Sequence, residues 1–220
     1  MWRRRGVSPE QARGALNADP LAVLASNGQL PVPAKACLGV MADLAVWTAE
    51  NYPHVTAVPV ATAPDHHAGA TAAQDVAVGM ATAVEYLRAM TRAGLSVDDA
   101  ARQMLFSISV GTHHFLAVAK LRAARRLWGR AVEACGGSPG AAAMRLHIRI
   151  SKRVLTQRDP YVNLLRNMVG CFAAGVGGAD AITSVPFDSV AALPDALGHR
   201  IARNTGLILQ EEAHLNRGFL

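Results

Sequence analysis

The feature that most constrains the fold is a repeated alternation between short β-branched runs and longer amphipathic segments. The runs predict strands at residues 55–61, 105–110, 144–150 and 181–185, and each is followed by a segment with helical spacing of apolar residues. Repeated strand-helix units build parallel sheets covered by helices. We therefore expect an α/β fold with about four βα units and parallel strands.

Capping signals and apolar spacing predict the helices. Gly94 is placed to end one of them, and Thr112 to open another. Asp159 followed by Pro160 predicts a helix start, because the Asp side chain accepts free amide hydrogens and Pro at the first helical position sacrifices no needed donor. The expected helices are 33–51, 70–93, a short helix opened by Ser96, 113–135, 159–175 and 194–213.

The third predicted strand alternates strictly. Arg145, His147 and Arg149 fall on one face, and apolar residues fall on the other. The charged face must therefore border a polar site or an unclosed edge. The alternation of elements alone fits both an open doubly wound sheet and a (β/α)8 barrel, and no Gly-rich phosphate motif follows any strand.

Charge and cysteine usage narrow the functional classes. The net charge is +6, and basic residues cluster in two places, residues 3–5 and a helix segment, residues 120–130. Few aromatic side chains interleave with these residues, so we expect a solvated or partner-facing helix and no nucleic-acid partner. The longest apolar runs are too short to span a bilayer, so no membrane partner is expected. The three dispersed cysteines fit a reducing, cytoplasmic location.

Five blocks of sequence, taken in order, carry a family resemblance. They are NADPL at 17–21, AKLRAARRLW at 119–128, DPYVNLLR at 159–166, GGADA at 177–181 and RIARNT at 200–205. The chain resembles the acyl-CoA-binding barrel of the cobalamin-dependent methylmalonyl-CoA mutases, especially their small, non-catalytic subunit. The resemblance favours a partial (β/α)8, TIM-type barrel. It implies a basic extension at 1–18, an incomplete barrel domain at 19–217 and a divergent C-terminus at 218–220, as in a truncated barrel.

The resemblance also implies which site residues are present. Pro64 stands where the catalytic subunits have a substrate-contacting histidine, Gln103 replaces a CoA-contacting arginine, and Pro186 replaces a serine. No catalytic, metal-binding or cofactor-binding residue is therefore expected. His147 is retained, Arg149 replaces a glutamine, and Arg102 lies beside Gln103. The expected substrate-binding residues are His147, Arg149 and Arg102.

The resemblance further implies partners and a cofactor. The cobalt-ligating Asp-x-His-x-x-Gly motif is absent, so adenosylcobalamin in the assembled enzyme is not expected to be bound by this chain. The leading hypothesis is a small-subunit-like segment that pairs with a catalytic mutase subunit and is inactive alone. An acyl-CoA-binding fragment that uses Arg149 is an alternative. A metal-dependent barrel enzyme is another, and it would use the histidines His66, His67, His113, His114 and His147.

Other polar and reactive residues have plainer interpretations. Asp75 and Glu85 lie on a predicted helix without a second carboxylate at a useful distance, so both are expected to be surface charges. Cys171 lies in an apolar helix, where a buried structural thiol is expected.

Overall fold

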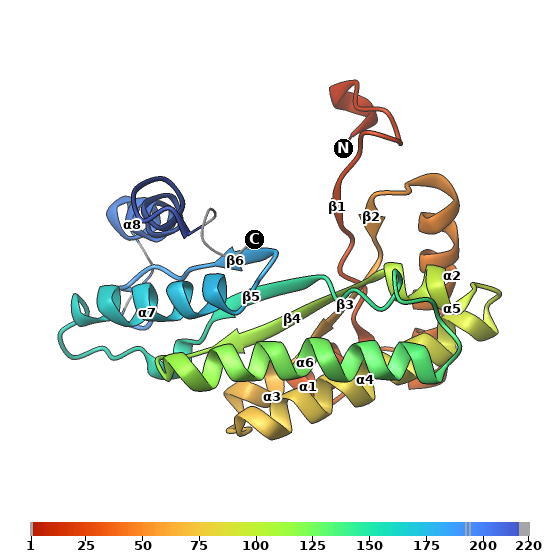
Figure 1. Ribbon diagram of the computed structural model, residues 1–220, viewed down its shortest axis with the longest axis horizontal. Coiled ribbons are helices and arrows are strands. Elements are labelled where there is room, and N and C mark those ends of the chain that lie inside the picture. Colours follow the sequence, from red (N-terminus) through yellow and green to blue (C-terminus); the bar gives the residue numbers. More distant parts are fainter. Residues whose placement is uncertain (1, 192, 194, 216–220) are drawn as a thin grey trace.

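The computed structural model describes residues 2–191, 193 and 195–215 (Figure 1). A four-stranded parallel sheet has the order β3 (Val58–Ala61), β4 (Met104–Val110), β5 (Leu146–Ile150) and β6 (Ala181–Thr183). A second parallel pair joins β1 (Gly14–Ala15) to β2 (Val55–Thr56). The predicted α/β fold with parallel strands is thus confirmed.

The predicted strand at 55–61 is split into β2 and β3 at Ala57. The Ala57 amide donates to Oε1 of Gln103 at 3.1 Å, and its carbonyl accepts from the Ala18 amide at 3.0 Å. The chain here passes from pairing with β1 to pairing with β4. β1 lies within residues 1–18, and the domain boundary at residue 18 stays a prediction.

The helices that link the sheet strands cover one face of the sheet. α4 (Ala72–Arg92) lies between β3 and β4, α6 (His114–Ala134) between β4 and β5, and α7 (Val162–Val176) between β5 and β6. α4 packs against α6, and α6 against α7 (Figure 1). Parallel strands that follow one another in sequence, with right-handed crossovers, place their helices on the same face of the sheet. In a doubly wound sheet the strand order reverses, and helices cover both faces. The arrangement is therefore an arc of a barrel.

Shorter elements surround this arc. α3 (Ala63–His67) and α5 (Val97–Arg102) flank α4, and the 3-10 turn η2 (Lys152–Val154) follows β5. The 3-10 turn η1 (Arg3–Arg5), α1 (Pro20–Asn27) and α2 (Ala34–Asn51) precede β2. α8 (Ala196–Leu207) and the π-helical turn η3 (Ile208–Glu212) end the described part of the chain.

The strand pleat separates the core from the opposite face of the sheet. The even-numbered residues of β3, β4 and β5 are apolar and buried in the core: Val58, Val60, Met104, Phe106, Ile108, Val110, Leu146, Ile148 and Ile150. Trp128 of α6 packs edge-on against Phe106, with ring centroids 4.9 Å apart. Because successive side chains point to opposite faces, the odd-numbered residues are left to face the concave side.

Two predicted helix starts are wrong. α7 begins at Val162, and Asp159 has a positive φ of 52° and does not cap it. Backbone bonds from Val162 to the Asp159 carbonyl and from Asn163 to the Pro160 carbonyl form a tight turn first. α6 begins at His114, with His113 and not Thr112 at the N-cap position.

The remaining boundaries differ by smaller amounts. The third and fourth strands are shorter than predicted, at Leu146–Ile150 and Ala181–Thr183. α8 begins at Ala196, and the predicted start at residue 194 lies outside the described residues, as do residues 218–220. Within the described ranges, no helix combines the length and apolarity that a membrane crossing requires.

Candidate functional site

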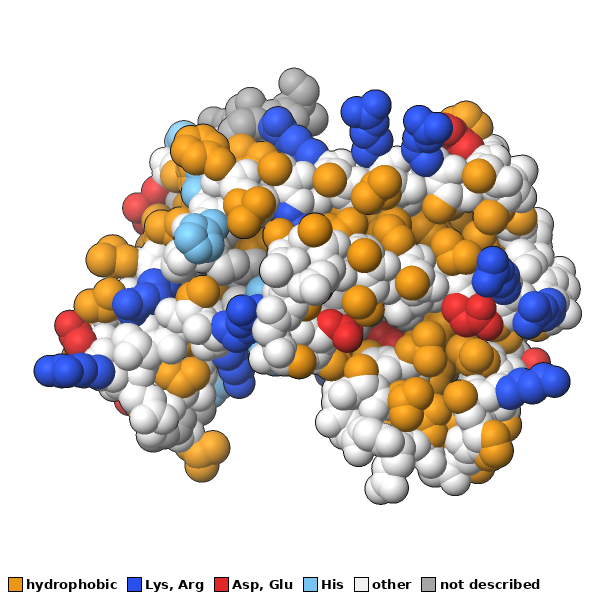
Figure 2. Space-filling view, turned by 90° about the horizontal axis from the view of Figure 1, so that it is seen from below, with side chains coloured by type: hydrophobic (Ala, Val, Ile, Leu, Met, Phe, Trp, Pro, Cys, Tyr) orange, Lys and Arg blue, Asp and Glu red, His pale blue; other side chains and the backbone are white. Residues whose placement is uncertain are grey.

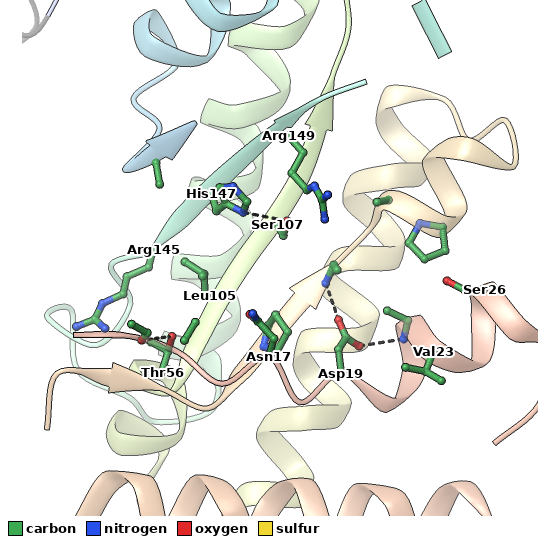
Figure 3. A pocket seen from close by; sticks show the side chains of 18 of the residues that line it. Asn17, Asp19, Val23, Ser26, Thr56, Leu105, Ser107, Arg145, His147 and Arg149 are labelled. Atoms are coloured by element: carbon green, nitrogen blue, oxygen red, sulfur yellow. Dashed lines mark hydrogen bonds between the residues drawn. The ribbon is translucent and has the colours of Figure 1, made fainter. Parts of the chain in front are cut away.

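The concave side of the sheet borders a cavity of about 950 Å³ (Figure 3). Odd-numbered strand residues form one wall, among them Pro59, Leu105, Ser107, His147 and Arg149. The segment from β1 through α1 forms the opposite wall. The predicted polar face of β5 therefore faces a cavity, because the pleat that buries its even residues turns its odd residues this way.

His147 lies at the centre of the sheet wall. Its Nδ1 is 3.3 Å from Oγ of Ser107 on β4, and its Nε2 is 2.8 Å from Oγ1 of Thr183 on β6. Burial lowers the pKa of His147 below its usual value, and the positive charge of Arg149 adds to this effect. The imidazole is therefore neutral at pH 7, with both nitrogens engaged by hydroxyl groups.

Two arginines flank His147, Arg149 on β5 and Arg145 directly before it. Arg145 and Arg149 are exposed, line the cavity and form no ion pair with any other described residue. Figure 3 shows both side chains on the side of His147, with Arg149 on β5 and Arg145 on the residue before it. A wall that presents two guanidinium groups favours an anionic ligand, because carboxylates and phosphates accept two parallel hydrogen bonds from a guanidinium.

Asp19 is the acidic residue of the cavity lining, and its oxygens are already in use. Oδ1 accepts from the Ala22 amide at 2.9 Å and from the Tyr86 hydroxyl at 2.5 Å, and Oδ2 accepts from the Ala61 amide at 2.9 Å. Burial raises the pKa of Asp19, while these hydrogen bonds oppose the rise. Asp19 thus attaches the start of α1 to β3 and α4 at the cavity edge.

The structure brings together two of the three predicted substrate-binding residues. His147 and Arg149 both line the cavity, whereas Arg102 on α5 pairs with Asp99 at 3.1 Å and Asp98 at 3.7 Å away from it. Gln103 is buried at the Ala57 backbone, and Pro64 of α3 lines the cavity.

A second polar cluster lies beyond the C-terminal ends of β4 and β5. Asp75 of α4 is buried and pairs with Lys120 of α6, whose Nζ also donates to the Ser109 carbonyl at 2.8 Å. His66 of α3 bridges Asp75, at 3.4 Å, and Oγ of Ser151, at 2.7 Å. The prediction that Asp75 is a surface charge is wrong, because α6 supplies a buried cation opposite it.

The charges in this cluster depend on one another. Burial would raise the pKa of Asp75, but hydrogen bonding from His66 and the charge of Lys120 outweigh it, so the pKa is lowered. Burial lowers the pKa of Lys120, and the Asp75 carboxylate opposes this. The cluster joins α3, α4, α6 and the end of β5, which fixes the helix that carries Pro64.

The histidines do not assemble a metal site in the part of the chain that the structure describes. His66 and His67 lie with ring centroids 6.0 Å apart, and both His66 nitrogens have protein partners. No group of three or more His, Cys, Asp or Glu side chains among the described residues could hold a metal ion. The hypothesis of a metal-dependent barrel enzyme has no support in this arrangement.

Fold and site together define an α/β protein of the partial-barrel class with a cation-lined cavity on its concave side. The family model of methylmalonyl-CoA mutase matches residues 1–218. The chain belongs to the methylmalonyl-CoA mutase family.

Curated relatives agree with this assignment. The chain is 46% identical over 217 residues to the methylmalonyl-CoA mutase small subunit of Streptomyces virginiae, and the matched region covers 99% of this chain and 34% of the relative. It is 36% identical over 214 residues to methylmalonyl-CoA mutase of Escherichia coli (strain K12), covering 97% and 30%. It is 45% identical over 159 residues to the probable small subunit of Mycobacterium tuberculosis (strain ATCC 25618 / H37Rv), covering 69% and 25%. The chain thus spans about a third or less of the length of these relatives.

Proposed function

We propose that this chain is a barrel segment of the small-subunit type, which pairs with a catalytic mutase subunit and does not catalyse the isomerisation itself. The observation that carries the proposal is Pro64 at the cavity wall, where the family resemblance implies a histidine. Proline has no side-chain donor, so it cannot stabilise a thioester carbonyl. Identity to proteins named as small subunits supports the same assignment.

Adenosylcobalamin, in this proposal, is held elsewhere in the assembled enzyme. Cobalt ligation by imidazole needs a free ring nitrogen, but both nitrogens of His147, the histidine of the cavity lining, have partners within the protein. The described residues around the cavity therefore do not fit this cofactor. The cytoplasmic location proposed with it is supported by three free cysteines, Cys37, Cys135 and Cys171.

The test of this proposal is co-purification. The chain is co-expressed with the catalytic mutase subunit of its own organism, and a stoichiometric complex is expected on size exclusion. The purified chain alone, supplied with adenosylcobalamin and methylmalonyl-CoA, is expected to show no turnover. Isomerisation by the isolated chain, or failure of the two chains to associate, would contradict the proposal.

A second candidate function is binding of an acyl-CoA in the cavity. The guanidinium groups of Arg145 and Arg149, which form no ion pair with other described residues, favour it. Arg149→Ala is expected to weaken CoA binding at least tenfold, because a charge-assisted hydrogen bond to phosphate contributes about 1.5–3 kcal/mol and about 1.4 kcal/mol is a factor of ten. Isothermal titration of CoA measures the change. Arg102→Ala serves as the matched control, since Arg102 lies outside the cavity and is expected to leave CoA affinity unchanged.

A further inference from the structure

Four apolar side chains lie exposed on the outer surface of α6 and α7. Phe115 is 84% exposed, Leu165 is 68% exposed, and Val169 and Phe172 are each 38% exposed. Leu165, Val169 and Phe172 follow one another at i, i+4 and i+7, so they form one stripe on α7. His114 links the two helices, with its ring centroid 5.0 Å from Phe115 and 5.2 Å from Phe172. We call these four residues the α6–α7 patch.

The surface beside the patch is basic. Arg122 and Arg126 are exposed and lie at i+7 and i+11 from Phe115, so they continue its face along α6. Neither arginine, nor the exposed Arg130, forms an ion pair with another described residue. Glu133 is the acidic residue of α6, and α7 has none. Figure 2 shows Lys and Arg side chains along one edge of the helical face, with apolar side chains beside them.

The total surface of the chain leaves room for an interface. The chain exposes 12210 Å², whereas a compact monomer of 23.2 kDa would expose about 9,700 Å². The excess is roughly three times the ~800 Å² that each partner contributes to a standard protein interface. Contiguous apolar surface with a charged rim is the composition expected of a docking site.

We propose that the α6–α7 patch, together with the arginine row formed by Arg122 and Arg126, is the surface that docks the catalytic mutase subunit. The matching region of that subunit would carry apolar side chains with acidic neighbours. The inference rests on the pairing proposed above. A second copy of this chain is the poorer occupant, because an isologous contact at this site would bring the arginine rows together. Phe115 and Leu165, the most exposed of the patch, are the anchors.

The experiment measures affinity for the catalytic subunit by surface plasmon resonance, using the full chain. Phe115→Ser combined with Leu165→Ser is expected to weaken binding at least tenfold, and Arg122→Glu combined with Arg126→Glu to weaken it and reduce its salt dependence. Val40→Ser is the matched control, since Val40 on α2 is 69% exposed and lies outside the patch. Circular dichroism checks that each variant folds.

The outcomes separate the two proposals. If the unsubstituted chain binds and both double variants bind equally well, the docking surface is wrong and the pairing stands. If the unsubstituted chain does not bind, the pairing fails and the docking surface fails with it. Homodimerisation of the chain alone that is abolished by Phe115→Ser would assign the patch to a second copy and overturn the inference.

Discussion

At the scale of single residues, Asp75 and Lys120 form a buried ion pair, whereas the other Lys and Arg ion pairs among the described residues are at least partly exposed. Both side chains are almost fully removed from solvent, and Lys120 has one further partner, the Ser109 carbonyl. An ion pair in this setting stabilises only if both charges remain, because either charge alone would be buried without compensation. His66 and Ser151 complete the polar surroundings.

Removing Lys120 should therefore be more damaging than removing a surface arginine. Lys120→Met is expected to lower the free energy of unfolding by about 3–5 kcal/mol, because the buried Asp75 carboxylate loses its lysine partner. Arg126→Met on the same helix is expected to change it by less than about 0.5 kcal/mol. Urea denaturation measures both. The double variant Asp75→Leu/Lys120→Met should regain part of the loss, and equal losses in the single and double variants would refute a pairing role.

His147 provides a residue-scale prediction about pH. Its pKa is lowered in the folded chain, mainly by burial and secondly by Arg149. The unfolded chain then binds this proton more readily than the folded chain does, so the contribution of His147 to stability is lost as the pH falls below about 6.5. Arg149→Ala should raise the pKa of His147 without restoring it to about 6.5, because burial remains. NMR titration of the imidazole measures the shift. An unchanged pKa would show that the charge of Arg149 does not act on His147.

At the scale of elements, the sequence predicted features that follow from a periodic residue pattern. It missed short strands and contacts between residues far apart in the chain. The polar face of β5 was predictable from Arg145, His147 and Arg149, because the period of two is a property of any strand. β1 pairs over only two residues with β2, and so short a strand leaves no periodic signal. Asp75 and Lys120 are 45 residues apart, and only the packing of α4 on α6 brings them together.

The two Asp-Pro pairs of the chain show how a local signal depends on its surroundings. Asp19 and Pro20 start α1 as the rule predicts, with the Asp19 side chain accepting from Ala22. Asp159 and Pro160 do not start α7, because the backbone there first forms a tight turn. The same two residues thus cap one helix and precede a turn before another. Sequence alone could not distinguish these cases, since Asp19 is also held by Tyr86 and Ala61.

Asp19 should accordingly control how firmly α1 is attached at the cavity. Asp19→Ala removes the helix cap and the contacts to Tyr86 and Ala61, so we expect the chain to lose about 2 kcal/mol or more of stability. Amide exchange in α1 should accelerate more than exchange in α7. Tyr86→Phe removes the contact to Asp19 and the hydrogen bond that the Tyr86 hydroxyl accepts from the Leu21 amide, but it leaves the helix cap and the Ala61 contact, so it should have the smaller effect. Equal acceleration in α1 and α7 would indicate global destabilisation and not local release of the helix.

At the scale of the whole molecule, the arc exposes surface that a closed barrel would bury. All three residues of β6 are exposed, and among the described strands β6 pairs only with β5. An unpaired strand edge and exposed apolar helix surface both favour association. The stability of this chain should therefore depend on what covers it, in addition to its own core.

Thermal unfolding with and without the catalytic mutase subunit tests this dependence. A partner that binds only the folded chain stabilises it by about 2.7 kcal/mol when its free concentration is 100 times the Kd. The melting temperature should therefore rise with partner concentration, and at the same concentrations it should rise less for Phe115→Ser/Leu165→Ser than for Val40→Ser. The isolated variants should melt close to the unsubstituted chain, since the altered side chains are exposed. A melting temperature independent of partner concentration would mean that the folded arc is not the species that the partner recognises.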